Sequence, residues 1–325
     1  LGYRNFKPRL SECQNMNAPT EIAAKWGAEG PVELITEREN AVYRIMRDGA
    51  PAALRLHRAG YQNEASILSE LSWTTRLADA GFACPKPIAQ QDGAFTAQLA
   101  DGRFASVISW VEGAPIGGAD MPFIGTVTAH CDLYHKLGHL LAQLHDTSDA
   151  INTEDIIRPA WDLPGLLGKS PFWGMFWENP SLSSGEKKLM IYAQDAAHAH
   201  LKAMKDADFG LIHADALQEN VFTQGSDLTL IDFDDAGFGY RGYDLGVSLS
   251  QHYSLRYLDD LTAALQAGYG TLRNAPSLED IKFFLMLRSF ASSGWVISRQ
   301  PKKSPAHRIY AERALHLAHH WLTTP

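Results

Sequence analysis

The stretch FGLIHADALQENVFTQGSDLTLIDFDDAGFG, residues 209–239, decides both the fold and the chemistry expected of this chain. Within it, NVFT and LTLIDF have the character of strands and QGSD that of a turn, so we expect a β-hairpin. Counting back from the turn places Asn220 opposite Asp232, to within one residue of register. Two oxygen-bearing side chains held side by side predict a site for a hard cation such as Mg²⁺, which takes one or two protein oxygens and completes its shell with phosphate and water.

The loop before this hairpin adds a third carboxylate. His213-Ala214-Asp215 ends five residues upstream of Asn220. A loop aspartate beside a metal–phosphate site is suitably placed to accept a proton from an attacking hydroxyl. A single aspartate in a loop is more often a turn former or a helix cap, but His, Asp, Asn and Asp at these spacings favour a functional site. We interpret His213 as an orienting residue rather than as a proton shuttle.

The composition is that of an ordinary globular protein. The chain has 325 residues, 45% hydrophobic and 20% charged, which predicts about two lobes with a full core. A net charge of −8 argues against a protein that binds nucleic acid by neutralising phosphates. Three widely spaced cysteines imply no disulfide framework and favour a reducing compartment. The N-terminal residues lack a signal-peptide core, and no apolar stretch approaches the ~20 residues that span a bilayer. We therefore expect a cytoplasmic protein with neither a nucleic acid nor a membrane as partner.

The chain changes character about a third of the way along. The first part has strand-like segments separated by turns and one amphipathic helix with apolar residues at helical spacing, at 63–81. From Glu112 onward helical patterns dominate, interrupted by the stretch quoted above. We expect an α+β, bilobal architecture: a small antiparallel-sheet lobe with one helix at residues 1–110 and a larger, mostly helical lobe at residues 111–325. The hinge is expected near Trp110–Gly113, with a cleft between the lobes.

The spacing His213-x-Asp215-x-x-x-x-Asn220, followed by Asp232 at a strand end, resembles the catalytic-loop and metal-aspartate signature of kinases. Over roughly residues 32–300, the chain is similar to the aminoglycoside phosphotransferase / homoserine kinase-like family, which has a protein-kinase-like fold. It is also similar to a bacterial stress-response branch of that family, which phosphorylates Ser/Thr of proteins.

This resemblance implies that the first lobe binds the nucleotide. ENAVYRI, around Asn40, matches the hairpin that covers the nucleotide. ALRLHR places Arg55 as the basic residue that contacts phosphate, and ILSELSW places Glu70 as its partner. ISWVEGAP matches the hinge, whose backbone at Ser109 and Val111 would hold adenine. Because Arg55 stands where the broader kinase pattern has Lys, a pseudokinase that binds nucleotide without catalysis stays an alternative.

For the second lobe, the resemblance implies that Asp215 and His213 are the catalytic residues and that Asn220 and Asp232 are the metal ligands. Asp244 in YRGYDLG would brace the catalytic loop. The implied cofactors are ATP and Mg²⁺. The predicted reaction moves the γ-phosphate of ATP to an alcohol hydroxyl of a small molecule. HADALQENVF and AGFACPKPIAQQDG look most like the homoserine kinase branch, so a homoserine-like amino alcohol is favoured. A Ser/Thr protein kinase of the stress-response type, acting on a protein substrate, is the runner-up.

Three other patterns have less specific interpretations. GFGYRG at residues 237–242 spells GxGxxG, but without a βαβ unit around it a dinucleotide site is not favoured. Three histidines near the C-terminus have helical spacing and could bind zinc, although the polar surface of a helix is the better interpretation: His316, His319 and His320. Three tryptophans could line an acceptor pocket, although anchoring an insert is the more common role: Trp161, Trp173 and Trp177.

Overall fold

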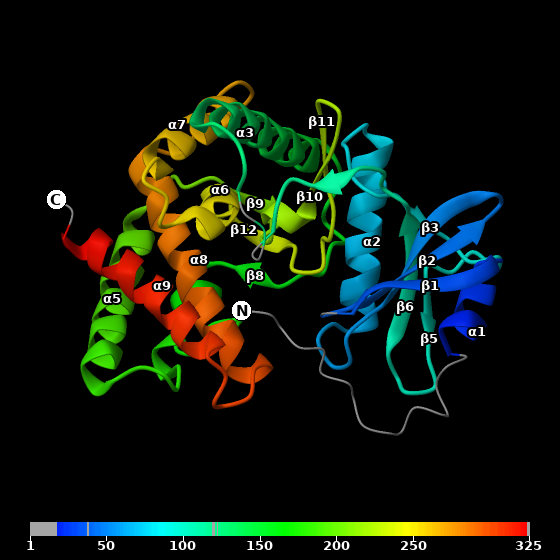
Figure 1. The fold of residues 1–325 in the computed structure, drawn as a ribbon, viewed down its shortest axis with the longest axis horizontal. Helices are drawn as coiled ribbons and strands as arrows, with labels where there is room; N and C mark the ends of the chain where they lie inside the picture. Colours follow the sequence, from blue (N-terminus) through cyan, green and yellow to red (C-terminus); the bar gives the residue numbers. More distant parts are fainter. Residues whose placement is uncertain (1–17, 38, 119–120, 122, 324–325) are drawn as a thin grey trace. The chain divides into compact units, whose positions relative to one another are not determined.

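The computed structural model describes residues 18–37, 39–118, 121 and 123–323 (Figure 1). By its contacts the chain divides into two compact units. The first comprises the residues up to Thr75 together with Pro85–Val111, and the second comprises Arg76–Cys84 and Glu112–Pro325.

The first unit is built on an antiparallel sheet in the order β1-β2-β3-β6-β4, with β5 also paired to β6. Its strands are β1 (Glu29–Glu37), β2 (Ala41–Arg47), β3 (Ala50–Leu56), β4 (Pro87–Ile88), β5 (Thr96–Gln98) and β6 (Phe104–Ser109). Helix α2 (Glu64–Asp79) begins in this unit, and a short helix that the sequence analysis did not anticipate, α1 (Ala18–Ala24), precedes β1.

Strand β3 lies at the centre of that sheet because its sequence is almost wholly apolar. Residues from Ala52 to Leu56 are buried, and β2 and β6 pair with the strand on either side. Trp26, just after α1, is fully buried and donates its indole N–H to the carbonyl oxygen of Ile88 at 2.8 Å. The charged Arg55 is therefore embedded in an apolar strand, where an arginine needs a partner.

The second unit is mainly helical. Its helices are α3 (Val127–Ala150), α4 (Leu163–Leu167), α5 (Ser184–Ala203), α6 (Arg241–Leu249), α7 (Leu258–Tyr269), α8 (Leu278–Arg299) and α9 (Ala306–Thr323). Side-chain caps fix several starts: Thr126 accepts from the backbone of α3, and Ser183 and Glu186 form a capping box on α5. Helix α8 is buried on nearly all sides through its middle, and α9 lies beside it (Figure 1).

Two small sheets in the second unit carry the stretch quoted at the outset. One has the order β11-β10-β7, and the other has the order β8-β12-β9. Their strands are β7 (Ala114–Pro115), β8 (Ala160–Trp161), β9 (Phe209–Ile212), β10 (Val221–Gln224), β11 (Asp227–Leu230) and β12 (Gly237–Tyr240). Short 3₁₀ turns lie at η2 (Phe176–Glu178), η3 (Gln218–Asn220) and η4 (Ser250–His252).

The expected hairpin is present, but its strands are shorter than predicted. Val221 pairs with Leu230, and one further bond joins the Ile231 N–H to the Asn220 carbonyl oxygen at 2.9 Å. Asn220 thus belongs to the η3 turn rather than to a strand, and Asp232 lies beyond the strand end with φ of 64°. The left-handed backbone at Asp232 ends the pairing, because extended strands require a negative φ.

Candidate active site

The loop after β9 is held in place by Asp244 of α6. Its carboxylate accepts from two successive backbone N–H groups, those of His213 at 2.8 Å and Ala214 at 2.6 Å. Ala214 is buried with φ of 63°, a conformation that costs an L-residue about 1–2 kcal/mol. The two bonds to Asp244 stabilise this unfavourable backbone, so Asp244 has the bracing position expected from the sequence.

Asp244 is itself kept ionised by its surroundings. Burial alone raises the pKa of Asp244, but hydrogen bonds from His145 and from the backbone of His213 outweigh it and hold the pKa below its usual range. The His145 ring lies 3.1 Å from the carboxylate through Nε2 and 2.8 Å from the Tyr269 hydroxyl through Nδ1. Burial lowers the pKa of His145, and the hydrogen bond to Asp244 opposes that effect.

His213 is enclosed in the same loop. Its Nδ1 accepts from the backbone N–H of Asp215 at 3.2 Å, and its Nε2 lies 2.9 Å from the Ile231 carbonyl oxygen, to which it donates. Both ring nitrogens are used within the protein and the side chain is fully buried. This geometry suits the orienting role that we assigned to His213.

Asp215 is held from two sides. One carboxylate oxygen lies 2.6 Å from Nη2 of Arg288, and the other accepts from Nδ2 of Asn220 at 2.9 Å. Its side chain is 19% exposed. Burial raises the pKa of Asp215, Arg288 opposes that effect, and the nearby carboxylates of Asp235 and Asp232 add to it, with the result well above the usual range. A carboxylate fixed in this way can orient an acceptor hydroxyl and accept its proton.

The metal ligands expected from the sequence lie next to this carboxylate. The amide nitrogen of Asn220 donates to both the backbone carbonyl and the carboxylate of Asp215, each at 2.9 Å. The amide oxygen of Asn220 is therefore the end that remains for a cation. Asp232 is half-buried and close enough to Asp215 to raise its pKa. One amide oxygen and one carboxylate fit Mg²⁺, which usually keeps several waters and binds through few protein groups. No cluster of three or more His, Cys, Asp or Glu suited to a metal occurs within the described residues.

In the first unit the structure brings Arg55 and Glu70 together. Nη1 of Arg55 lies 2.7 Å from Oε1 of Glu70, and the side chains are only 5% and 2% exposed. This is a buried ion pair rather than a surface pair, so removing either member would leave a buried charge.

The other predicted nucleotide-binding residues also belong to the first unit. The Asn40 side chain accepts from the backbone N–H of Arg58 at 2.9 Å, which closes the end of the β2–β3 hairpin. The backbone N–H of Ser109 donates to the Lys86 carbonyl oxygen at 2.8 Å, and the Ser109 hydroxyl accepts from the backbone N–H of Lys86 at 2.9 Å. Val111 follows β6 and lies outside any helix or strand. Contacts of these residues with adenine stay a prediction.

Sequence reasoning missed Arg288. It extends from α8 to Asp215 and also donates to the Ala214 carbonyl oxygen at 2.9 Å, while its guanidinium lies 4.6 Å from the ring centroid of Trp173. No spacing rule links residues so distant in the sequence. The signal that could have found it is an arginine within the apolar run FFLMLRSF, because a buried arginine requires a partner.

The three weaker patterns have structural explanations. The glycines of GFGYRG allow close packing: a Cβ on Gly237 would lie 2.2 Å from the Pro159 carbonyl oxygen, and one on Gly239 would lie 2.4 Å from the Ile212 side chain. Trp161 and Trp173 are buried against each other with ring centroids 4.9 Å apart, which favours the anchoring role.

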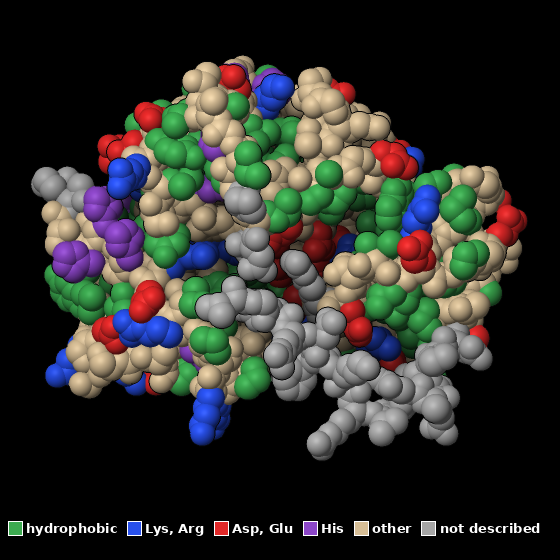
Figure 2. Space-filling view, viewed as in Figure 1, with side chains coloured by type: hydrophobic (Ala, Val, Ile, Leu, Met, Phe, Trp, Pro, Cys, Tyr) green, Lys and Arg blue, Asp and Glu red, His purple; other side chains and the backbone are tan. Residues whose placement is uncertain are grey.

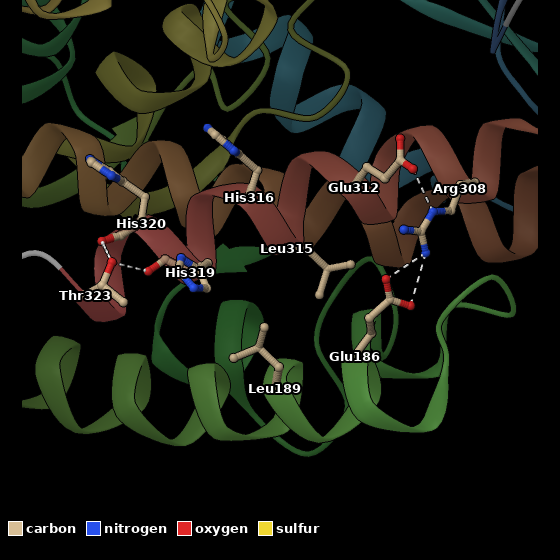
Figure 3. Close-up of a pocket in the computed structure, with 9 residues that line it drawn as sticks. All are labelled: Glu186, Leu189, Arg308, Glu312, Leu315, His316, His319, His320 and Thr323. Carbon is tan, nitrogen blue, oxygen red and sulfur yellow. Dashed lines mark hydrogen bonds and ion pairs between the residues drawn. The ribbon is translucent and has the colours of Figure 1, made fainter.

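The three C-terminal histidines lie on the exposed side of α9, where the space-filling view shows histidine side chains gathered (Figure 2). They line a groove of about 580 Å³ between α5 and α9, together with the ion-paired Arg308 and Glu186. Figure 3 shows that His316 and His320 point away from α5. Asp215 does not line this groove. Among the described residues, no group of three or more His, Cys, Asp or Glu is suited to hold a metal ion there.

Comparison with known proteins identifies the family. A model of the phosphotransferase enzyme family matches residues 32–281, and the chain therefore belongs to that family. Homoserine kinase of Rhizobium rhizogenes (strain K84) is 31% identical over 238 residues, which are 71% of this chain and 64% of that protein. The chain spans about half to two thirds of the length of the curated relatives that it matches.

Solved structures confirm the α+β, bilobal, protein-kinase-like fold expected from the sequence. A microcompartment-associated aminopropanol kinase is 28% identical, with a TM-score of 0.81 over 93% of this chain and 96% of that one. The amicoumacin kinase hAmiN, solved with AMP-PNP, Ca²⁺ and Ami, is 18% identical, with a TM-score of 0.74 over 93% of this chain and 92% of that one. ATP and Mg²⁺ stay a prediction for this chain. Among the residues that the structure describes, no helix is both long and apolar enough to cross a bilayer.

Proposed function

We propose that this chain is an ATP- and Mg²⁺-dependent kinase that phosphorylates the hydroxyl of a small amino alcohol or hydroxy amino acid of the homoserine type. The observation that carries the proposal is the Asp215 carboxylate, fixed between Arg288 and Asn220 on a braced loop. The homoserine and aminopropanol kinases among the related proteins support the acceptor class.

In this proposal Asp215 orients the acceptor hydroxyl and takes its proton as the oxygen bonds to the γ-phosphorus, while the bond to ADP breaks. Asn220 and Asp232 would hold Mg²⁺, which supplies neutralisation of phosphate charge. Arg55, positioned by Glu70, would contact the nucleotide phosphates. His213 and Asp244 keep the loop in its shape. Positioning and charge stabilisation account for most of the acceleration in this class of reaction.

The test is ADP release from Mg-ATP across a panel of acceptors: homoserine, threonine, 3-aminopropan-1-ol, choline, kanamycin and a generic Ser/Thr protein. Asp215→Asn is the control and should lose turnover while still binding AMP-PNP. Turnover on a small amino alcohol or hydroxy amino acid supports the proposal. Turnover on the protein alone would favour the stress-response type of kinase. An active Asp215→Asn enzyme would remove Asp215 from the mechanism, and nucleotide binding with no turnover at all would favour a pseudokinase.

A further inference from the structure

Among the described residues, a second arginine of the helical unit, Arg313, has no acidic partner. Arg313 on α9 is half-buried, and its Nε is buried without a hydrogen-bond partner within residues 18–37, 39–118, 121 and 123–323. The other α9 arginine, Arg308, is paired with Glu186 and Glu312, whereas within the same ranges no carboxylate forms an ion pair with Arg313. An arginine keeps its charge in proteins, so this part of the structure leaves a cation uncompensated.

The surroundings of Arg313 leave the edge of its guanidinium for a ligand. Its Cζ lies 5.0 Å from the ring centroid of Tyr253 and 5.6 Å from that of Tyr310. Both tyrosines are half-buried, so the group lies at the border of the protein with solvent. The Tyr253 side chain also hydrogen-bonds this guanidinium. A guanidinium has five N–H donors in a planar fork, and the Nε donor of Arg313 has no partner among the described residues, so donors remain for the two oxygens of a carboxylate.

One series of contacts leads from Arg313 to the catalytic carboxylate. Tyr310 lies 6.0 Å from Trp295, and Trp295 lies 6.4 Å from Trp173, measured between ring centroids. The Trp173 ring packs against the guanidinium of Arg288, and this guanidinium hydrogen-bonds Asp215.

A separate series starts at Tyr253. Two residues before it, Gln251 accepts from the backbone N–H of Gln218 at 3.1 Å and donates to Glu219 at 2.7 Å. Both partners belong to the same turn as Asn220. Arg313 is thus linked to Asp215 through aromatic contacts, and its neighbour Tyr253 lies two residues from Gln251, which hydrogen-bonds the turn that holds Asn220.

Electrostatics supports an anionic ligand here. Burial lowers the pKa of Arg313, the two tyrosines oppose that effect, and the positive charge of Arg288 lowers it further. Two cations that repel each other across a partly buried space are stabilised by an anion bound near them.

We propose that Arg313 binds the carboxylate of the phosphoryl acceptor, which makes the acceptor a hydroxy amino acid rather than a simple amino alcohol. This inference rests on the proposed function, because it concerns the acceptor of that reaction. The related proteins include a homoserine kinase, whose acceptor has a carboxylate, and an aminopropanol kinase, whose acceptor has none. In this proposal Arg313 favours the acceptor with the carboxylate.

The experiment compares homoserine with 3-aminopropan-1-ol, which has the same hydroxyl and amine but no carboxylate. The kcat/KM of the full chain with Mg-ATP is measured for both acceptors in the native protein, Arg313→Gln, Arg313→Lys and Arg308→Gln. We expect the native protein to favour homoserine by about 10- to 100-fold, the range for a hydrogen bond to a charged group. Arg313→Gln should abolish that preference through the KM for homoserine, Arg313→Lys should retain part of it, and Arg308→Gln should behave as the native protein.

Each other outcome overturns the inference in a distinct way. Equal use of both acceptors by the native protein, or an equal loss on both in Arg313→Gln, would mean that Arg313 does not bind a carboxylate. Turnover with kanamycin or choline but with neither of these acceptors would overturn the carboxylate assignment while leaving the phosphotransferase activity. If none of the acceptors in the panel supports ADP release, the proposed function itself is overturned. Melting temperatures of all variants, with and without AMP-PNP, separate a loss of folding from a loss of acceptor binding.

Discussion

Replacing Arg288 with Met tests whether an arginine on α8 positions the catalytic carboxylate. The substitution keeps much of the apolar stem that packs on Trp173 but removes the bonds to Asp215 at 2.6 Å and to the Ala214 carbonyl oxygen at 2.9 Å. The Asp215 carboxylate would then keep its hydrogen bond from Asn220 but lose the one from Arg288. We expect kcat to fall while the affinity for nucleotide stays unchanged.

The size of the effect follows from the burial of the pair. The Arg288 and Asp215 side chains are 6% and 19% exposed, so solvent screens their interaction only in part. A hydrogen bond to a charged group contributes about 1.5–3 kcal/mol, which corresponds to a loss in kcat of about 10- to 100-fold if it acts fully in the transition state. Breaking one partner of a buried ion pair costs about 3–5 kcal/mol of folding stability.

The assay measures kcat and KM by coupled ADP release, and AMP-PNP affinity by calorimetry. Phe283→Ala is the matched control on the same helix: its ring is buried against His200 and Trp321, and the truncation costs a similar ~3–5 kcal/mol. Arg288→Lys keeps the positive charge but lacks the planar fork of N–H donors, so its kcat should lie between those of the native protein and Arg288→Met. An unchanged kcat in Arg288→Met, or an equal loss of kcat in Phe283→Ala, would refute the positioning role.

Three further predictions concern the cation, the buried ion pair and acid stability. Asp232→Ala should raise the Mg²⁺ concentration for half-maximal activity by about 10- to 100-fold, whereas Asp227→Ala, at the exposed start of β11, should not. Identical Mg²⁺ dependence in both variants would exclude Asp232 as a ligand. Glu70→Gln should cost about 3–5 kcal/mol of stability in denaturant and weaken AMP-PNP binding, because Arg55 would be left buried beside a neutral group; a stable variant with native affinity would contradict this. Burial lowers the pKa of His252 from 6.5 to about 4. Between these pH values the unfolded chain binds a proton that the folded chain does not, so the stability should decrease by up to about 3 kcal/mol as the pH is lowered. His252→Asn should flatten that slope in denaturation curves taken from pH 7 to 4, and an unaltered slope would assign the acid sensitivity to other groups.

The part of the site that could be predicted from the sequence is the part that is local. His213, Asp215 and Asn220 lie within eight residues, so a single strand, loop and turn determine how they meet. Even there the register was only approximate. The left-handed backbone at Asp232 ends the hairpin before that residue, and alternation of residue types carries no information about a positive φ at an aspartate.

Arg288 and Arg313 could not be placed in the same way, because their positions depend on how α8 and α9 pack rather than on spacing. Arg288 is 73 residues from Asp215, and a shift of one residue along α8 would rotate its side chain by about 100° away from the loop. An amphipathic pattern would have set that rotation, but α8 is apolar on almost every side and gives no preferred face. The sequence does show that an arginine lies in a helix with few polar neighbours, and a buried arginine requires an opposite charge or a ligand. Arg288 finds Asp215, whereas Arg313 finds no carboxylate within the described chain. The difference between two arginines near one loop is therefore the most direct physical argument that the acceptor brings a negative charge of its own.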